Sequence, residues 1–337
     1  MPEKISPENL EKQFTIDVRS EGEFAHAHVP GAINIPLLND ENRKIIGTTY
    51  KQLGREAAVA KGFELVGPNF ANFFRELREK SGDKTPVFYC WRGGLRSAIS
   101  ATIYEWGGLP CKVISGGYKA YRRNVLKGLQ RKLNLHVLSG YTGVGKTEIL
   151  KLLKLKGAQV IDLENLANHK GSALGGLGMP AQFSNEMFEN MLYELWKNMN
   201  ASDLVFLENE SRKIGSNILP ESVWLQMENS PLTDIILNKP IRLQRILKEY
   251  GAFPKEDLAA CTVKLKKRLG GLNLKNALEA LESGNISAWA GILMEYYDGT
   301  YLHGRKDKTQ VNNSMEWDWN QAETCSAKLM ELAKSIH

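Results

Sequence analysis

The sequence has no long hydrophobic run and few cysteines. None of its apolar stretches approaches the roughly 18 consecutive residues of a membrane span, and the first residues, MPEKISPENLEKQ, lack the apolar centre of a signal peptide. Four cysteines occur among 337 residues, at positions 90, 111, 261 and 325, without CxxC or Cys/His metal spacing. This spacing suggests neither a disulfide framework nor a zinc site, and a need for another metal stays open. We expect a cytoplasmic protein that does not bind membranes.

The charge balance is moderate rather than extreme. The formal net charge is +6, with 42% hydrophobic and 24% charged residues, as in an ordinary globular protein. Such an excess permits a polyanionic partner without requiring one. A length of 337 residues predicts two domains, because domains average about 100 to 200 residues.

Short apolar runs alternate with helical patterns over the first 118 residues. Strand-like runs lie at 14–18, 31–35, 86–90 and 111–115, and helical ones at 20–24, 69–81 and 96–108. Strands that alternate with helices predict a parallel or mixed sheet covered on both faces. We therefore expect an N-terminal α/β domain at residues 8–118.

A basic segment then separates two α/β patterns. Residues 119–133 contain six lysines and arginines and no acid, and we predict that they form a helical connector. Strand-like runs resume at 135–140, 159–164, 204–208 and 233–238, and from residue 257 apolar residues recur at helical spacing without further strand-like runs. These patterns predict a second α/β domain at residues 134–337 with a helical tail.

The second domain opens on a phosphate-binding motif. GYTGVGKT fits G-x-x-x-x-G-K-[ST] and lies between a predicted strand and a predicted helix. Glycines let backbone N–H groups converge on phosphate oxygens, and the lysine places a positive charge on the outer phosphates. We expect this P-loop to bind a phosphorylated ligand; its residues are Gly140, Tyr141, Thr142, Gly143, Val144, Gly145, Lys146 and Thr147.

Other polar residues follow the predicted strands of this domain. Asp162 and Glu208 are alternative Walker B acids, and Thr147 would ligate magnesium if a nucleotide is bound. His169, Lys170, Arg212 and Lys213 lie on predicted loops at the phosphate end of the sheet. Each of these residues is equally well explained as a solvent-exposed loop or strand-end charge.

The first domain contains one cysteine in unusual surroundings. In VFYCWRGGLRSA, Cys90 ends a predicted strand and precedes a glycine-rich loop and a helix. Loop N–H groups, the helix N-terminus and the two arginines would favour a thiolate and hold an anion. A buried apolar cysteine is the alternative. The proposed catalytic residues are Cys90, Arg92 and Arg96, in a loop with Trp91, Gly93, Gly94 and Leu95.

Three segments together resemble a rhodanese domain. They are IDVRSEGEFAHAHVPGAINIP (16–36), FYCWRGGLRSA (88–98) and VISGGYKAY (113–121), which carry the D-x-R, H-x-P-G-A and cysteine-loop signatures. The resemblance implies a cysteine that carries sulfur or selenium. Five residues separate Cys90 from Arg96, one more than in plain rhodaneses, and this spacing also occurs in cysteine phosphatases.

The combination of both halves resembles the tRNA 2-selenouridine synthase family. CWRGGLRS, GYTGVGKT, VIDLENLANHKGSALGG (160–176) and ENESRKIG (208–215) carry this likeness over nearly the full length. It implies a rhodanese-like α/β domain fused to a P-loop NTPase-like α/β domain. It also implies geranylation of a wobble 2-thiouridine with geranyl diphosphate, then replacement of the S-geranyl group by selenium from selenophosphate through an S-selanylcysteine at Cys90. No tightly bound cofactor is expected, and a need for Mg²⁺ stays open.

A tRNA partner would be held through its phosphates. The candidate residues are Lys119, Arg122, Arg123, Lys127, Arg131, Lys132, Lys264, Lys266, Lys267 and Arg268. Each is also compatible with a solvated helix face. Two other enzyme classes fit the residues: an ATP-dependent tRNA sulfurtransferase, and a rhodanese-fold cysteine phosphatase or reductase. The choice of tRNA and the oligomeric state are not encoded in these motifs.

Overall fold

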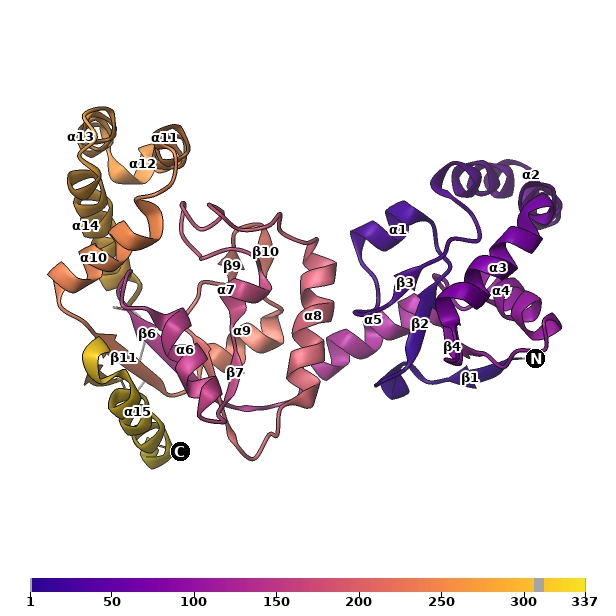
Figure 1. The fold of residues 1–337 in the computed structure, drawn as a ribbon, viewed down its shortest axis with the longest axis horizontal. Coiled ribbons are helices and arrows are strands. Elements are labelled where there is room, and N and C mark those ends of the chain that lie inside the picture. Colours follow the sequence, from indigo (N-terminus) through magenta and orange to yellow (C-terminus); the bar gives the residue numbers. More distant parts are fainter. Residues whose placement is uncertain (1, 306–311, 337) are drawn as a thin grey trace. The chain divides into compact units, whose positions relative to one another are not determined.

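The computed structural model describes residues 2–305 and 312–336. It divides into two compact units (Figure 1). The first unit comprises residues 1–129 and 186–194, and the second comprises residues 130–185 and 195–337. Both contain a parallel sheet with helices, which confirms the predicted α/β class.

The first unit is built on a five-stranded parallel sheet in the order β1-β5-β4-β2-β3. Val87, Phe88 and Tyr89 of the central strand β4 are completely buried, as expected for a strand covered on both faces. The strands are β1 (Glu3–Ile5), β2 (Phe14–Asp17), β3 (Ile33–Asn34), β4 (Pro86–Tyr89) and β5 (Lys112–Ile114).

Helices surround this sheet, and the longest of them, α2, was not predicted. The helices are η1 (Pro7–Asn9), α1 (Glu21–His26), α2 (Asp40–Val66), η2 (Gly67–Asn69), α3 (Phe70–Ser81), α4 (Leu95–Trp106) and α5 (Gly117–Gly128). Residues 186–194 of α8 (Asn185–Asn198) also belong to this unit. Helix α2, which the sequence patterns did not indicate, is interrupted at Gly54 and buries only Ala58. The predicted connector helix ends at Gly128, five residues earlier than expected.

The second unit contains another five-stranded parallel sheet, in the order β12-β11-β6-β8-β7. Its strands are β6 (Asn134–Gly140), β7 (Gln159–Ile161), β8 (Leu204–Glu208), β11 (Leu232–Ile236) and β12 (Asn312–Glu316), and β9 (Lys213–Ile214) pairs with β10 (Asn217–Ile218) in a separate hairpin. The expectation of a tail without strands is wrong, because β12 pairs with β11 along its whole length. The segment NNSME has no apolar run, so composition gave no strand signal.

Two groups of helices cover different parts of the second unit. Helices α10 (Lys239–Tyr250), α11 (Lys255–Lys264), α12 (Lys266–Leu269), α13 (Gly271–Glu282) and α14 (Ile286–Arg305) gather in one cluster around a shared apolar core (Figure 1). Helices α6 (Lys146–Leu155) and α15 (Ala322–Ile336) share a second apolar core with the sheet. The remaining elements are α7 (Leu163–Leu166), α9 (Glu221–Glu228) and η3 (Trp319–Gln321).

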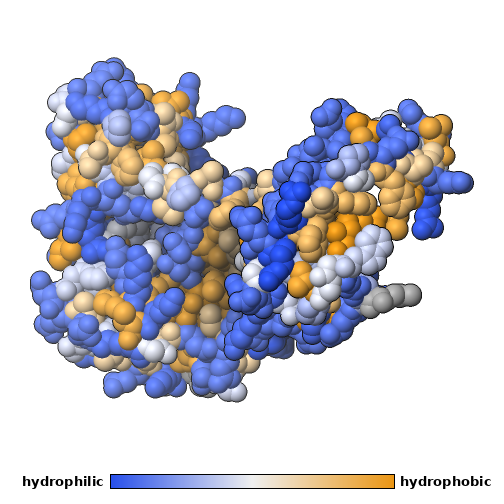
Figure 2. Space-filling view, turned by 45° about the vertical axis from the view of Figure 1, so that its right-hand side comes forward, coloured by the Kyte–Doolittle hydropathy of each residue, from blue (hydrophilic) through white to orange (hydrophobic). Residues whose placement is uncertain are grey.

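The face shown in Figure 2 is largely hydrophilic, with hydrophobic residues in small groups between charged ones. Within residues 2–305 and 312–336, every helix is too short or too polar to cross a lipid bilayer.

Candidate functional site

The loop after β4 carries Cys90 and packs against the start of α5. The Tyr118 backbone N–H donates to the Cys90 carbonyl, and the Lys119 N–H donates to the Trp91 carbonyl, both at 2.9 Å. Gly117, with φ of 61°, comes so close that a Cβ there would lie 2.3 Å from the Cys90 carbonyl oxygen. The first turn of α5 therefore determines the shape of the cysteine loop.

The Cys90 side chain itself is enclosed, with 4% of the residue exposed. Its Sγ atom lies 3.2 Å from Ser97 Oγ and 3.8 Å from the Gly94 carbonyl oxygen. Arg92 is exposed, and Arg96 is directed at a carboxylate rather than at the sulfur. The expected cationic cradle is therefore not assembled around the sulfur in this conformation, and the exposed residues 91–95 would have to shift to admit a substrate.

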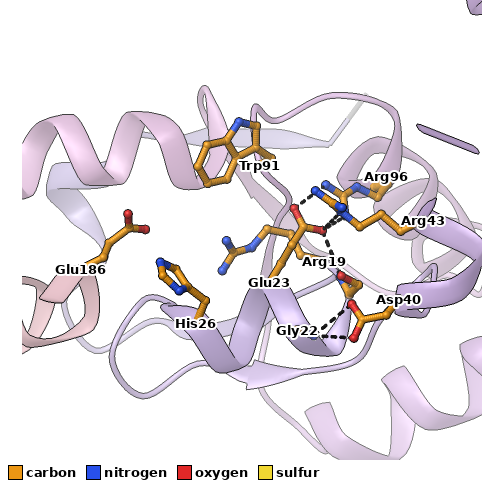
Figure 3. A pocket seen from close by; sticks show the side chains of 10 residues that line it. Arg19, Gly22, Glu23, His26, Asp40, Arg43, Trp91, Arg96 and Glu186 are labelled. Carbon is orange, nitrogen blue, oxygen red and sulfur yellow. Dashed lines mark hydrogen bonds and ion pairs between the residues drawn. The ribbon is translucent and has the colours of Figure 1, made fainter. Parts of the chain in front are cut away.

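Three arginines from distant segments line a cleft of about 490 Å³ in the first unit (Figure 3). Arg19 follows β2, Arg43 lies on α2 and Arg96 lies on α4. Trp91 from the cysteine loop and His26 from α1 also line the cleft, whereas Cys90 does not. Arginine side chains suit an anionic ligand, because each presents several N–H donors in a fixed geometry.

Glu23 holds two of these arginines. Its Oε2 atom is 2.6 Å from Arg96 Nη1 and 3.0 Å from Arg43 Nε (Figure 3). Burial alone would raise the pKa of this carboxyl, but the hydrogen bond and charge of Arg96, with the charge of Arg43, lower it to about 2. Glu23 therefore stays ionised and competes with any anion that enters the cleft.

Arg19 is held in place by Asp17, the other residue of the D-x-R signature. Its Nη2 atom donates to Asp17 Oδ2 at 2.6 Å and to the Ala27 carbonyl at 2.7 Å, and its guanidinium stacks 4.0 Å from the Tyr118 ring centroid. Asp17 and Arg19 are both buried. His28 is likewise structural, because its Nδ1 atom lies 2.9 Å from the Phe24 carbonyl oxygen.

Sequence reasoning missed most of this cleft. Arg19 was visible in the D-x-R signature, but only as part of a family resemblance. Glu23, Asp40 and Arg43 had no motif, and the last two lie on the unpredicted helix α2. Glu186, at the start of α8, is the third acidic residue of the lining, after Glu23 and Asp40.

The P-loop of the second unit has the geometry that its motif predicts. Strand β6 ends at Gly140, and α6 begins at Lys146. Gly143 and Gly145 have φ of 86° and 89°, which glycine adopts without strain. Lys146 Nζ lies 3.5 Å from the Gly140 carbonyl, and Thr147 Oγ1 donates to Glu164 Oε2 at 3.1 Å. The loop therefore has the curled backbone that a phosphate-binding motif requires.

Carboxylates gather beside Lys146 and Thr147. Glu208, at the end of β8, is buried, accepts the Glu164 backbone N–H at 2.7 Å and leaves its Oε2 atom without a partner. Burial raises the pKa of Glu208, and burial with the neighbouring Glu164 charge raises the pKa of Glu210 to about 8. Asp162, the alternative Walker B acid, instead caps α7 by accepting the Asn165 N–H.

The predicted loop residues are placed differently from one another. His169 is partly buried, and its Nδ1 atom has no hydrogen-bond partner. Lys170 forms a 2.7 Å ion pair with Glu249. Arg212 and Lys213 are exposed at the β9–β10 hairpin. Within the described residues, no group of three or more His, Cys, Asp or Glu side chains is arranged to hold a metal ion.

Two further arginines at the P-loop come from α10, and no sequence motif indicated them. Arg242 is buried, forms a bidentate pair with Asp298 of α14 and donates to the Thr142 carbonyl at 3.2 Å. Arg245 lies against the P-loop at Gly145 and stacks 4.0 Å from the Trp319 ring centroid. Only the three-dimensional fold brings these residues to Gly140–Thr147.

The basic residues proposed for RNA fall into two groups. Arg122 is engaged with Glu189 and Asn190, and Arg131 donates to the Trp196 and Met199 carbonyls, so both already have protein partners. The other candidates are exposed: Lys119, Arg123, Lys127, Lys132, Lys264, Lys266, Lys267 and Arg268. Tyr118 and Tyr121 are buried and pack in the core.

Comparison with known proteins covers both units. Residues 6–124 match the rhodanese-like domain family, and residues 133–330 match the family described as the tRNA 2-selenouridine synthase AAA domain. A tRNA 2-selenouridine synthase of Psychromonas ingrahamii is 33% identical over 91% of this chain and 93% of its own. One from Shewanella frigidimarina is 34% identical over 89% and 90%. Because these likenesses extend across both units, the chain belongs to the tRNA 2-selenouridine synthase family.

Proposed function

We propose that this protein modifies tRNA in two steps. In the first step, the sulfur of a wobble 2-thiouridine attacks C1 of geranyl diphosphate, the C1–O bond breaks, and diphosphate leaves while the base loses its N3 proton. In the second step, selenium from selenophosphate bonds to C2, the C2–S bond breaks and geranyl thiolate leaves, and water takes the phosphoryl group from selenium to release inorganic phosphate. The observation that carries the proposal is that one chain contains both a cysteine loop beside an arginine-lined cleft and a preformed P-loop.

The P-loop unit supports the geranyl step. Departure of diphosphate needs positive groups that neutralise the charge on the leaving oxygens. Lys146 and the amides of Gly140–Gly145 supply such groups, without a need for nucleotide hydrolysis. The Thr147 hydroxyl and the Glu164 carboxylate, 3.1 Å apart, are the groups that would meet a Mg²⁺ ion bound to the diphosphate.

The first unit supports the selenium step. Arg19 is held in place by Asp17, and Arg96 and Arg43 would be released from Glu23 when a selenophosphate dianion enters the cleft. The same movement of residues 91–96 would expose Cys90, which we assign as the residue that contacts the selenium donor. The exposed basic residues of α5 and α12 would hold the tRNA phosphates.

Nucleoside analysis tests this function. Purified protein is incubated with a 2-thiouridine tRNA, geranyl diphosphate and selenophosphate, and the nucleosides are identified by mass spectrometry. We expect S-geranyl-2-thiouridine without selenophosphate and 2-selenouridine with both. A product that appears only with ATP would indicate a sulfurtransferase instead, and release of phosphate from an aryl phosphate would indicate a phosphatase.

The two steps should separate by mutation. We expect Cys90→Ser to retain geranylation and to lose selenium incorporation, and Lys146→Ala to weaken geranylation. Cys111→Ser is the matched control for the thiol, because Cys111 is also buried in the first unit, and Lys151→Ala is the control for a lysine on α6. Loss of both products in a folded Cys90→Ser protein would contradict this division.

A further inference from the structure

A small apolar cavity lies directly beside the P-loop of the second unit. Its walls include Thr142 of the P-loop, Ile246 of α10 and Trp289, Leu293 and Met294 of α14. The segment between α7 and α8 closes it with Leu174. The cavity therefore adjoins the P-loop at Thr142 and lies within the apolar core of α10–α14.

The helices that form the cavity walls also contact the P-loop. Arg242 of α10 donates to the Thr142 carbonyl and pairs with Asp298 of α14, so both helices that wall the cavity also hold the P-loop. A Cβ on Gly143 would lie 3.1 Å from Ile246, which shows how closely the loop approaches the cavity wall. A ligand whose phosphates occupy the P-loop would have its remainder next to these helices.

The lining is mostly carbon, and its side-chain hydroxyls are those of Thr142, Ser172, Tyr250 and Tyr297. Trp289 Nε1 donates to Thr262 Oγ1 at 3.0 Å, and the Tyr297 hydroxyl accepts the Ala173 N–H at 3.0 Å. In the described part of the chain, no cavity-lining residue has a buried side-chain nitrogen or oxygen without a partner. A nucleobase placed here would lose hydrogen bonds to water without replacing them, whereas a hydrocarbon would not.

The cavity is nearly closed as it stands. Its volume is about 20 Å³, which is room for about one water molecule. A ten-carbon chain would require the walls to separate. Met294 is a flexible side chain, and Leu174 lies in a segment with glycines at 171, 175, 176 and 178, two of them with positive φ. The wall therefore contains the residues best suited to adapt.

We propose that this cavity binds the hydrocarbon chain of an allylic prenyl diphosphate whose phosphates occupy the P-loop, and that its depth selects the chain length. This inference rests on the proposed geranyl transfer and identifies which residues recognise the prenyl group. Ala290 and Met294, one helical turn apart on α14, line the cavity and determine how far a chain can enter.

Chain-length selectivity tests the inference. Wild type, Ala290→Leu and Met294→Ala are given dimethylallyl, geranyl or farnesyl diphosphate with a 2-thiouridine tRNA, and S-alkylated nucleosides are quantified by mass spectrometry. Filling the cavity with Ala290→Leu should raise the ratio of five-carbon to ten-carbon product about tenfold, and Met294→Ala should raise the ratio of fifteen-carbon to ten-carbon product about tenfold. Misfolding cannot produce these opposite shifts.

The control is Leu281→Ala. Leu281 is buried in the same helical cluster, on α13, but does not line the cavity. This variant should lose stability while both product ratios stay within about twofold of wild type. Unchanged ratios in Ala290→Leu and Met294→Ala, with active geranylation, would overturn the inference and leave the proposed function intact.

A binding measurement separates the inference from the reaction. Affinities for geranyl diphosphate and inorganic pyrophosphate are measured by calorimetry. Wild type should bind geranyl diphosphate at least about tenfold more tightly, and Ala290→Leu should lose this preference while it retains its affinity for pyrophosphate. If no alkylated nucleoside forms but this preference persists, the proposed function fails and the prenyl site stands; equal affinities for both ligands in wild type would refute the site.

Discussion

Single residues fix the shape of the cysteine loop. Gly117 combines a positive φ with a close approach to the Cys90 carbonyl, so a side chain there would be strained and would also collide with the loop. Gly31 also has a positive φ, of 83°, but faces open space. A comparison of alanine substitutions at Gly31 and Gly117 therefore separates the destabilisation due to backbone strain from that due to the collision with the cysteine loop.

We expect Gly117→Ala to lower the free energy of unfolding by about 3 kcal/mol and Gly31→Ala by about 1 kcal/mol. Gly117→Ala should also reduce selenium incorporation, because the loop that carries Cys90 must move away from α5. Urea unfolding and nucleoside analysis provide the two measurements. Equal losses of stability in the two variants would show that the contact with Cys90 contributes nothing.

The ionisation of Glu23 makes the stability of the fold depend on pH. Its pKa is lowered to about 2 in the folded protein, so its ion pairs with Arg96 and Arg43 stabilise the fold above about pH 4.5. As pH falls through about 2, the carboxyl is protonated and this contribution is lost. Below pH 4.5 the fold should therefore become progressively less stable.

We expect Glu23→Gln to be less stable than wild type at pH 7, by on the order of 1 to 2 kcal/mol because solvent screens the ion pairs, and the difference to shrink as pH falls from 4.5 towards 2. The midpoints of urea unfolding, measured at pH 7, 4 and 2.5, give the comparison. The variant should also bind inorganic phosphate more tightly at pH 7, since Arg96 and Arg43 no longer have a competing carboxylate. A pH-independent difference would show that the ion pairs are not its origin.

At the level of elements, α10 and α14 act together as a support for the P-loop. The buried Arg242 joins them, because it contacts Asp298 of α14 and the Thr142 carbonyl. Removing a partner from a buried ion pair leaves the other charge uncompensated.

We expect Arg242→Met to lower stability by about 3 kcal/mol and to weaken the binding of inorganic pyrophosphate about tenfold. Arg242→Lys retains the charge but not the bidentate geometry. Its stability and its affinity for pyrophosphate should therefore lie between those of wild type and of Arg242→Met. Arg268→Met, at an exposed arginine of α12, is the control. Calorimetric titration gives the affinities, and normal pyrophosphate binding by a destabilised Arg242→Met protein would disprove the support role.

The elements that sequence predicts well are those with both an apolar run and a turn signal. The β4–loop–α4 and β6–loop–α6 segments have both and are confirmed. Helix α2 lacks a strong apolar face, since Ala58 is its only buried residue, and was missed for that reason. Strand β12 is polar and is specified by its pairing with β11.

The site residues also divide into those that lie in a local sequence motif and those that do not. Cys90 and Lys146 lie in local motifs and could be singled out from short stretches of sequence. Arg43, Arg242 and Arg245 reach the two sites from helices distant in sequence, and only the tertiary fold brings them there. Even a correct motif gave no indication that Glu23 would hold Arg96.

For the whole molecule, the two units should respond to different ligands. We expect inorganic pyrophosphate to slow amide hydrogen exchange at 140–147 and at the start of α6, and expect Lys146→Ala to abolish this protection without altering exchange in residues 88–96. Ligand binding to the native state stabilises the part that holds it. Equal protection of both units in wild type and in Lys146→Ala would refute separate anion sites.

Strand β12 has a consequence for the order in which the protein can fold during synthesis. The sheet that carries the P-loop needs residues 312–316 as its edge, so one edge of β11 stays unpaired until these residues have left the ribosome. The sheet of the first unit is complete once residue 114 has emerged. A nascent chain should therefore acquire its cysteine loop well before its phosphate-binding sheet, and chaperone contacts should concentrate on the unpaired edge of β11.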